Sequence, residues 1–140
     1  MVWKRPGIDD SIARPERPPP APSSADWLLG EALSSLHAAL QRAARGEKLS
    51  AARLVQEAVE RVAELCERQA ADDPAVPRDP FAPARRFERR FPDVAAALPG
   101  FLQGYERVPE SALAILEFLE ARFAVPPAMA AALRSLGRRD

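Results

Sequence analysis

Leucines recur at helical spacing early in the chain, and this recurrence constrains the fold more than any other feature. They fall three or four residues apart, as Leu29, Leu33, Leu36 and Leu40. Side chains at this spacing share one face of an α-helix. A serine at position 23 or 24 suits the N-cap, Asp26 suits the first turn, and Gly46 suits the end. The sequence therefore predicts an amphipathic helix from about residue 24 to residue 45.

A second helix is predicted directly after the connection 46–49. Its apolar positions are Leu54, Ala58, Val62 and Leu65, and Ser50 is the expected N-cap. On its exposed side the spacing predicts two i,i+4 ion pairs, Glu57–Arg61 and Glu64–Arg68. Because the connection is short, we expect the two helices to pack antiparallel as a hairpin.

Prolines divide the second half of the chain. Four of them lie between residues 74 and 83 and predict a loop, which Phe81 is expected to anchor. Short helices are predicted over 84–91 and over 93–98, the second capped by Asp93 and broken by Pro99 and Gly100. Longer helices are predicted over 109–124 and 127–136. No segment has the alternation of a strand, so the fold class is all-α, a four- to five-helix bundle over residues 24–140.

The first 23 residues have a different composition from the rest. They contain six prolines among charged side chains, which cannot continue a helix or supply much core. We predict a disordered, proline-rich arm over residues 1–23. Trp3 within it is interpreted as a stray aromatic of a loose terminus, with docking elsewhere as the alternative.

Charge and cysteine content exclude several classes of function. Lys+Arg and Asp+Glu are both 20, so no overall positive field attracts nucleic acid, and nucleic-acid binding is disfavoured. The single cysteine excludes an internal disulfide. With no apolar leader and no long apolar run, the sequence predicts neither signal peptide nor membrane span. The predicted location is the cytoplasm.

The sequence lacks the groupings that catalysis on its own would need. One histidine and one cysteine, far apart, do not make a soft-ligand metal site. The glycines are scattered and form no phosphate-binding loop. Paired aspartates occur only as adjacent residues, not as the alternate residues that aim two carboxylates the same way. We therefore predict no metal site and no cofactor for this chain alone, and interpret His37 and Cys66 as structural residues.

Four arginines and two phenylalanines gather on one short segment. On a helix Phe87 and Phe91 would face the core, and the arginines would flank that seam. The four are Arg85, Arg86, Arg89 and Arg90. Two interpretations stay open: a solvated helix face neutralised by nearby carboxylates, or a surface that binds an anion or a partner domain.

Five segments, taken in order, carry a family resemblance that covers roughly Leu36 to Leu136. They are Arg45–Ala51, Arg61–Leu65, Asp79–Phe81, Arg85–Pro92 and Glu110–Leu116. Together they resemble the helical C-terminal region of bacterial nucleotidyltransferases of the aminoglycoside-adenylyltransferase-like kind. In that family an N-terminal α/β domain holds the Mg-nucleotide with a Gly-Ser turn and two aspartates. The helical domain closes the cleft and helps bind the acceptor substrate.

The resemblance implies an accessory role for this chain. It has no Gly-Ser pair and no Asp-x-Asp, so the catalytic half is missing, and Mg and a nucleoside triphosphate would bind only to a separate catalytic domain. On this basis Glu47 and Tyr105 are predicted to bind substrate, and Arg85, Arg86, Arg89 and Arg90 to support the surface between domains.

The expected function is thus that of a non-catalytic helical domain, substrate-side or accessory, split or truncated from its catalytic domain. The alternative is a free-standing helical protein-interaction module. Some small helical partners of minimal nucleotidyltransferases are RNases with Arg-x4-6-His, but His37 has no arginine at that upstream spacing. RNase activity is disfavoured, and a homo-oligomer stays open.

Overall fold

The computed structural model describes residues 24–71 and 73–138, and this part of the chain is helical without strands. Its helices are α1 (Ala25–Ala44), α2 (Lys48–Gln69), α3 (Phe87–Arg90), α4 (Pro92–Phe101), α5 (Val108–Arg122) and α6 (Pro127–Gly137). The all-α prediction is confirmed. The described residues form six helices instead of four or five, because α3 is a single turn. The predicted arm of residues 1–23 lies outside the described residues.

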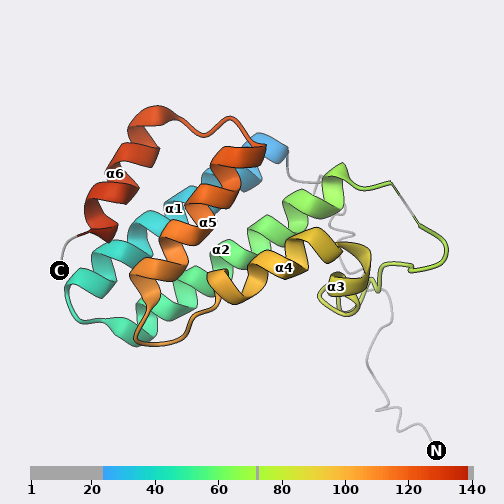
Figure 1. Cartoon of the computed structure of the whole chain (residues 1–140), viewed down its shortest axis with the longest axis horizontal. Helices are drawn as coiled ribbons and strands as arrows, with labels where there is room; N and C mark the ends of the chain where they lie inside the picture. Colours follow the sequence, from blue (N-terminus) through green and yellow to red (C-terminus); the bar gives the residue numbers. More distant parts are fainter. Residues whose placement is uncertain (1–23, 72, 139–140) are drawn as a thin grey trace, which may run out of the picture.

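Helices α1 and α2 form the predicted antiparallel hairpin (Figure 1). The Ser24 hydroxyl accepts the N–H of Trp27 at 3.1 Å and caps α1 as expected. At the other end Gly46 has φ 79°, a left-handed conformation that costs glycine little. The predicted leucine stripe of α1 is buried along its whole length.

Helix α2 begins earlier than the sequence predicts. Its N-cap is Glu47, which makes no capping hydrogen bond with its side chain, so the predicted Ser50 cap is wrong. The Ser50 hydroxyl instead accepts a hydrogen bond from Arg42 of α1, which joins the two helices near their connection. The ion pairs of α2 join Arg53 to Glu57 at 3.3 Å and Arg61 to Glu64, instead of the two predicted pairs.

The remaining helices pack on this hairpin. Helix α5 contacts both α1 and α2, and α4 packs on α5. Helix α6 lies at the edge of the bundle, where it contacts α1 and α5 (Figure 1). The core therefore lies where α1, α2 and α5 meet. Its large side chains, each 2% exposed or less, include Leu28, Leu36, Leu40, Leu65, Phe101, Ile115, Leu116, Leu119 and Leu133.

The short helices differ from their predicted bounds. Arg86 has φ 63°, a left-handed conformation outside a right-handed helix, so α3 starts only at Phe87. Helix α4 starts at Pro92, not at an Asp93 cap, and continues through Pro99 to Phe101. A proline this close to the end removes one hydrogen-bond donor, while continuing the helix buries Phe101 in the core.

The loop between α2 and α3 is not anchored as predicted. Phe81 is 97% exposed, so the expectation that it pins the loop to the bundle is wrong. The loop is held instead by polar contacts of Asp79, described below. No helix within residues 24–71 and 73–138 has the length and apolar character needed to cross a bilayer.

Candidate functional site

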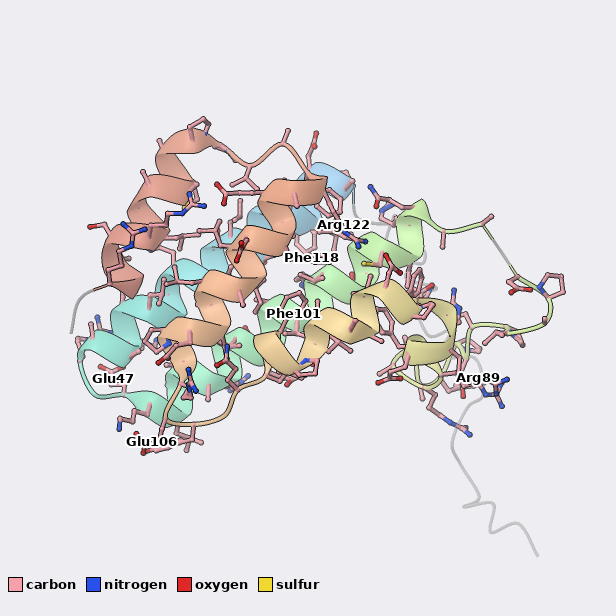
Figure 2. The ribbon with its side chains drawn as sticks, in the orientation of Figure 1. Glu47, Arg89, Phe101, Glu106, Phe118 and Arg122 are labelled. Atoms are coloured by element: carbon pink, nitrogen blue, oxygen red, sulfur yellow. The ribbon has the colours of Figure 1, made fainter. Side chains whose placement is uncertain are left out.

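The predicted site residues lie at two opposite ends of the bundle. Glu47 is in the α1–α2 connection, and Tyr105 is in the α4–α5 connection beside it. The four arginines lie far from both, on the loop before α3 and on α3 itself. Figure 2 shows this separation, with Glu47 and Glu106 at one end and Arg89 at the other. The structure therefore defines two surfaces instead of one site.

Contacts between the two connections organise the first end. Lys48 of α2 donates to the carboxylate of Glu106 at 2.5 Å, and its ammonium lies 5.7 Å from the ring centroid of Tyr105. The hydrogen bond to Glu106 raises the pKa of Lys48. Nearby, the N–H of Gln103 donates to the hydroxyl of the buried Ser111 at 3.0 Å. The contacts of Lys48 hold the α4–α5 connection against the start of α2, and the Gln103–Ser111 hydrogen bond holds it against the start of α5.

An apolar groove lies between these elements. Its volume is about 310 Å³, and its walls include Leu49, Val55, Phe101, Leu102, Tyr105 and Ser111. Three of its apolar side chains are exposed to solvent: Leu49 by 76%, Leu102 by 47% and Tyr105 by 53%. A gathering of exposed apolar side chains around a hollow is typical of a binding surface. We call this feature the Leu49–Tyr105 groove.

Glu47 lies at the same end as the groove but does not line it. Its carboxylate accepts a hydrogen bond from Arg45 at 2.9 Å, and both side chains are exposed. That hydrogen bond lowers the pKa of Glu47. A carboxylate with a lowered pKa is a weak base, so this position suits hydrogen bonding or charge pairing better than proton abstraction.

At the other end, Asp79 builds a tight turn around Phe81. One oxygen of its carboxylate accepts the N–H groups of Phe81 at 2.9 Å and Ala82 at 3.2 Å, and the other accepts from Arg85 at 3.3 Å. The hydrogen bond from the Phe81 N–H is the main cause of the lowered pKa of Asp79. The turn presents the phenylalanine ring to solvent in a fixed local conformation.

The four arginines differ in exposure and in ion pairing. Arg85 pairs with Asp79, while Arg86 and Arg89 are exposed, and no described residue forms an ion pair with either. Arg90 makes a two-pronged hydrogen bond with Glu67 of α2, and its side chain is only 8% exposed. The prediction that Arg90 belongs to an accessible surface is wrong, because its guanidinium is already occupied. We call the set Phe81, Arg85, Arg86 and Arg89 the Phe81–arginine surface.

Other residues weighed for chemistry have structural positions. Cys66 is buried, and burial raises the pKa of its thiol to about 11, so it is neutral at ordinary pH and a poor nucleophile. His37 is partly buried on α1. Residues 24–71 and 73–138 contain no group of three or more His, Cys, Asp or Glu side chains placed to hold a metal ion.

Sequence reasoning missed the apolar residues of the groove. Leu49 lies in the predicted connection 46–49, and Leu102 lies between two predicted helices, so neither was predicted as a site residue. The available signal was the presence of large apolar side chains in segments predicted to lie outside helices. Comparisons with protein-family models, with curated proteins and with solved structures give no match to this chain.

Proposed function

We propose that this chain is a non-catalytic helical domain that acts by docking onto a partner protein through the Phe81–arginine surface. The observation that carries the proposal is Phe81 itself, 97% exposed on a turn that Asp79 holds in place. An aromatic ring beside guanidinium groups is the combination that often dominates the energy of protein interfaces. A turn formed before binding also lowers the entropy cost of ordering it.

The exposed arginines indicate the chemistry of the partner's surface. Arg86 and Arg89 are exposed, and planar guanidinium groups bind carboxylates with paired hydrogen bonds. The partner face should therefore combine an apolar pocket for Phe81 with acidic side chains around it. The bundle behind this surface is held by the buried pair of Arg90 and Glu67, which fixes α3 to α2.

We further propose that the partner is a separate nucleotidyltransferase catalytic domain. The support is the resemblance of residues 36–136 to the helical half of such enzymes and the absence of Gly-Ser and Asp-x-Asp from the sequence. The position of Glu47 and Tyr105 at one end is compatible with an acceptor-binding role there. In this proposal Mg²⁺ and the nucleoside triphosphate bind to the partner, and this chain contributes to acceptor binding.

The test is co-expression with the product of an adjacent reading frame that contains Gly-Ser followed by Asp-x-Asp. We expect the two proteins to co-purify, and nucleotidyl transfer to an acceptor to require both. Co-purification without transfer would support docking but reject the split enzyme. No complex at micromolar concentrations of both proteins would reject the assignment of this partner.

Variants locate the docking surface. Arg86→Glu with Arg89→Glu should weaken the complex about tenfold or more, because like charges then face each other across the interface. Arg53 is an exposed arginine of α2 outside this surface, so Arg53→Glu is the matched control and should leave affinity unchanged. Equal effects of both substitutions would reject the Phe81–arginine surface as the docking site.

The second candidate function is a free-standing protein-interaction module. It is favoured by the fact that both the Phe81–arginine surface and the Leu49–Tyr105 groove are complete within this chain. The two functions differ in the partner. A bound protein that lacks the Gly-Ser and Asp-x-Asp motifs, and a complex without nucleotidyl transfer, would identify an interaction module.

A further inference from the structure

A separate hollow lies at the edge of the bundle, where α6 returns alongside α5 (Figure 1). Its volume is about 270 Å³, and its lining is Leu113, Leu116, Glu117, Arg134 and Arg138. Pockets for drug-sized ligands measure roughly 300–1,000 Å³, so this hollow suits a smaller molecule. We call it the Glu117–Arg138 hollow. It shares no residue with the Leu49–Tyr105 groove or with the Phe81–arginine surface.

Close packing between α5 and α6 holds the walls of this hollow. A Cβ atom on Gly137 would come within 2.8 Å of Leu113, so a larger residue there would have to displace that leucine. On the other side, Arg134 donates two hydrogen bonds to the carboxylate of Glu120, one of them at 3.0 Å. Leu116 is only 1% exposed and belongs to the core. The walls are therefore formed by contacts within the protein before any ligand binds.

The charged walls of the hollow have opposite signs and come from different helices. Glu117 of α5 and Arg138 of α6 both line it and are both exposed. Within residues 24–71 and 73–138, no ion pair joins these two side chains, whereas Arg134 is already paired with Glu120. The hollow thus offers a ligand one carboxylate and one guanidinium, placed on different sides of the same small space.

A ligand that matches both walls must carry a positive and a negative group of its own. Its ammonium group would donate to Glu117, and its carboxylate would accept paired hydrogen bonds from the guanidinium of Arg138. A simple anion would be repelled by Glu117, and a simple cation by Arg138. Leu113 and Leu116 add apolar surface, which favours an apolar side chain on the ligand. A free α-amino acid with an aliphatic side chain combines these groups in one small molecule.

We propose that the Glu117–Arg138 hollow binds a free aliphatic α-amino acid, with its ammonium group on Glu117, its carboxylate on Arg138 and its side chain on the two leucines. The ligand is small and the charged walls are at the surface, so the expected Kd is on the order of millimolar. The inference does not depend on the docking partner, because the hollow lies outside the Phe81–arginine surface.

NMR titration of the isotope-labelled full chain with L-leucine tests the proposal. We expect the amide signals of residues 113–117 and 134–138 to shift along one saturable curve. Glu117→Gln and Arg138→Gln should each weaken binding about tenfold or more, because each leaves one charge of the ligand without its partner.

Matched controls change the same residue types outside the hollow. Glu110→Gln removes an exposed carboxylate at the start of α5, and Arg53→Gln removes an exposed guanidinium of α2. Neither residue lines the hollow, so both variants should bind leucine with unchanged affinity. Unchanged affinity in these variants would assign the losses in the hollow variants to the hollow itself and not to the net charge of the protein.

Two probes that each lack one charge distinguish a site for amino acids from a site for simple ions. Isocaproate has the carboxylate and the branched chain of leucine without its ammonium group. Isoamylamine has the ammonium group and the branched chain without the carboxylate. We expect both to bind about tenfold more weakly than leucine, or less tightly still, because each meets an unmatched charge in the hollow.

Three results would overturn the proposal. The first is the absence of any saturable shift up to the solubility limit of leucine, as expected if Glu117 and Arg138 pair directly in solution. The second is an affinity for leucine that survives both Glu117→Gln and Arg138→Gln in proteins whose circular dichroism is unchanged, which would place the ligand elsewhere. The third is binding of isocaproate or isoamylamine as tightly as leucine, which would identify a simple ion site.

Discussion

Arg90 of α3 and Glu67 of α2 form a buried, two-pronged ion pair, with Nη2 and Oε2 2.5 Å apart and side chains 8% and 9% exposed. It joins residues 23 positions apart and fixes the single turn of α3 to the long helix of the hairpin. Nearby, the Phe87 and Phe91 rings pack with centroids 4.8 Å apart. Arg90, one of the four arginines predicted to support a binding surface, therefore stabilises that surface from behind.

The first prediction is that Glu67→Ala destabilises the protein strongly. The substitution leaves the Arg90 guanidinium buried without a partner, and breaking buried pairs in this way costs about 3–5 kcal/mol. Urea unfolding followed by circular dichroism measures the change. Replacing both partners, as Glu67→Leu with Arg90→Met, should restore much of the loss because no unpaired charge remains.

The matched control is the exposed pair of Arg53 and Glu57 on the same helix. Glu57→Ala should change the free energy of unfolding by only about 0.2–1 kcal/mol, since exposed pairs contribute little. Comparable losses for Glu57→Ala and Glu67→Ala would contradict the buried character of the Arg90 pair.

Local sequence patterns predicted the long helices. The features that these patterns did not predict depend on contacts between residues far apart in sequence. The leucine stripe of α1 and its ends at Ser24 and Gly46 could be predicted because they depend on neighbours within a few residues. The role of Arg90 could not, because Glu67 comes from another helix and no sequence spacing joins them. Pro99 shows the same limit, since burial of Phe101 outweighs a local signal to end the helix.

The candidate site, too, could be predicted only where it depends on local sequence and not where it depends on tertiary contacts. The cluster of arginines could be predicted from composition alone, but not the exposure of Phe81, the burial of Arg90 or the left-handed Arg86 that shortens α3. The Leu49–Tyr105 groove depends on contacts between elements: Lys48 of α2 bonds Glu106, and Ser111 of α5 accepts from Gln103 in the α4–α5 connection. Such a groove is a product of packing between segments more than 50 residues apart in sequence, as the Lys48–Glu106 separation of 58 positions shows.

The second prediction concerns Ser111, which is 2% exposed at the start of α5. Its hydroxyl accepts the N–H of Gln103, so Ser111→Ala leaves that donor without its partner and should cost about 1–3 kcal/mol. Chemical denaturation gives the free energy, and hydrogen exchange of the Gln103 amide should become faster. Unchanged exchange at Gln103 would show that this hydrogen bond does not hold the connection.

The third prediction is that Cys66 resists thiol reagents in the folded protein. Burial raises the pKa of its thiol from 9.0 to about 11, so little thiolate forms near neutral pH. Because the pKa of the thiol is raised in the folded protein, the neutral buried thiol stabilises the fold fully below about pH 9, and this stabilisation is lost as the pH rises toward about 11. Labelling should follow unfolding in urea, whereas a cysteine placed at the exposed Ser34 should react at once. Rapid labelling of native Cys66 would contradict its burial.

The last prediction is that the turn around Phe81 opens in acid. The carboxylate of Asp79 accepts two backbone N–H groups, and these bonds lower its pKa in the folded protein. A lowered pKa means that the turn is stabilised above the ordinary aspartate value of about 3.9 and loses this stabilisation as pH falls through the folded value. The amide NMR signals of Phe81 and Ala82 should therefore titrate together with a midpoint below about 3.9. Asp79→Asn keeps an acceptor oxygen without the charge, so the same amides should cease to titrate while the turn persists. A midpoint at or above the ordinary value would show that the carboxylate does not hold Phe81 in place.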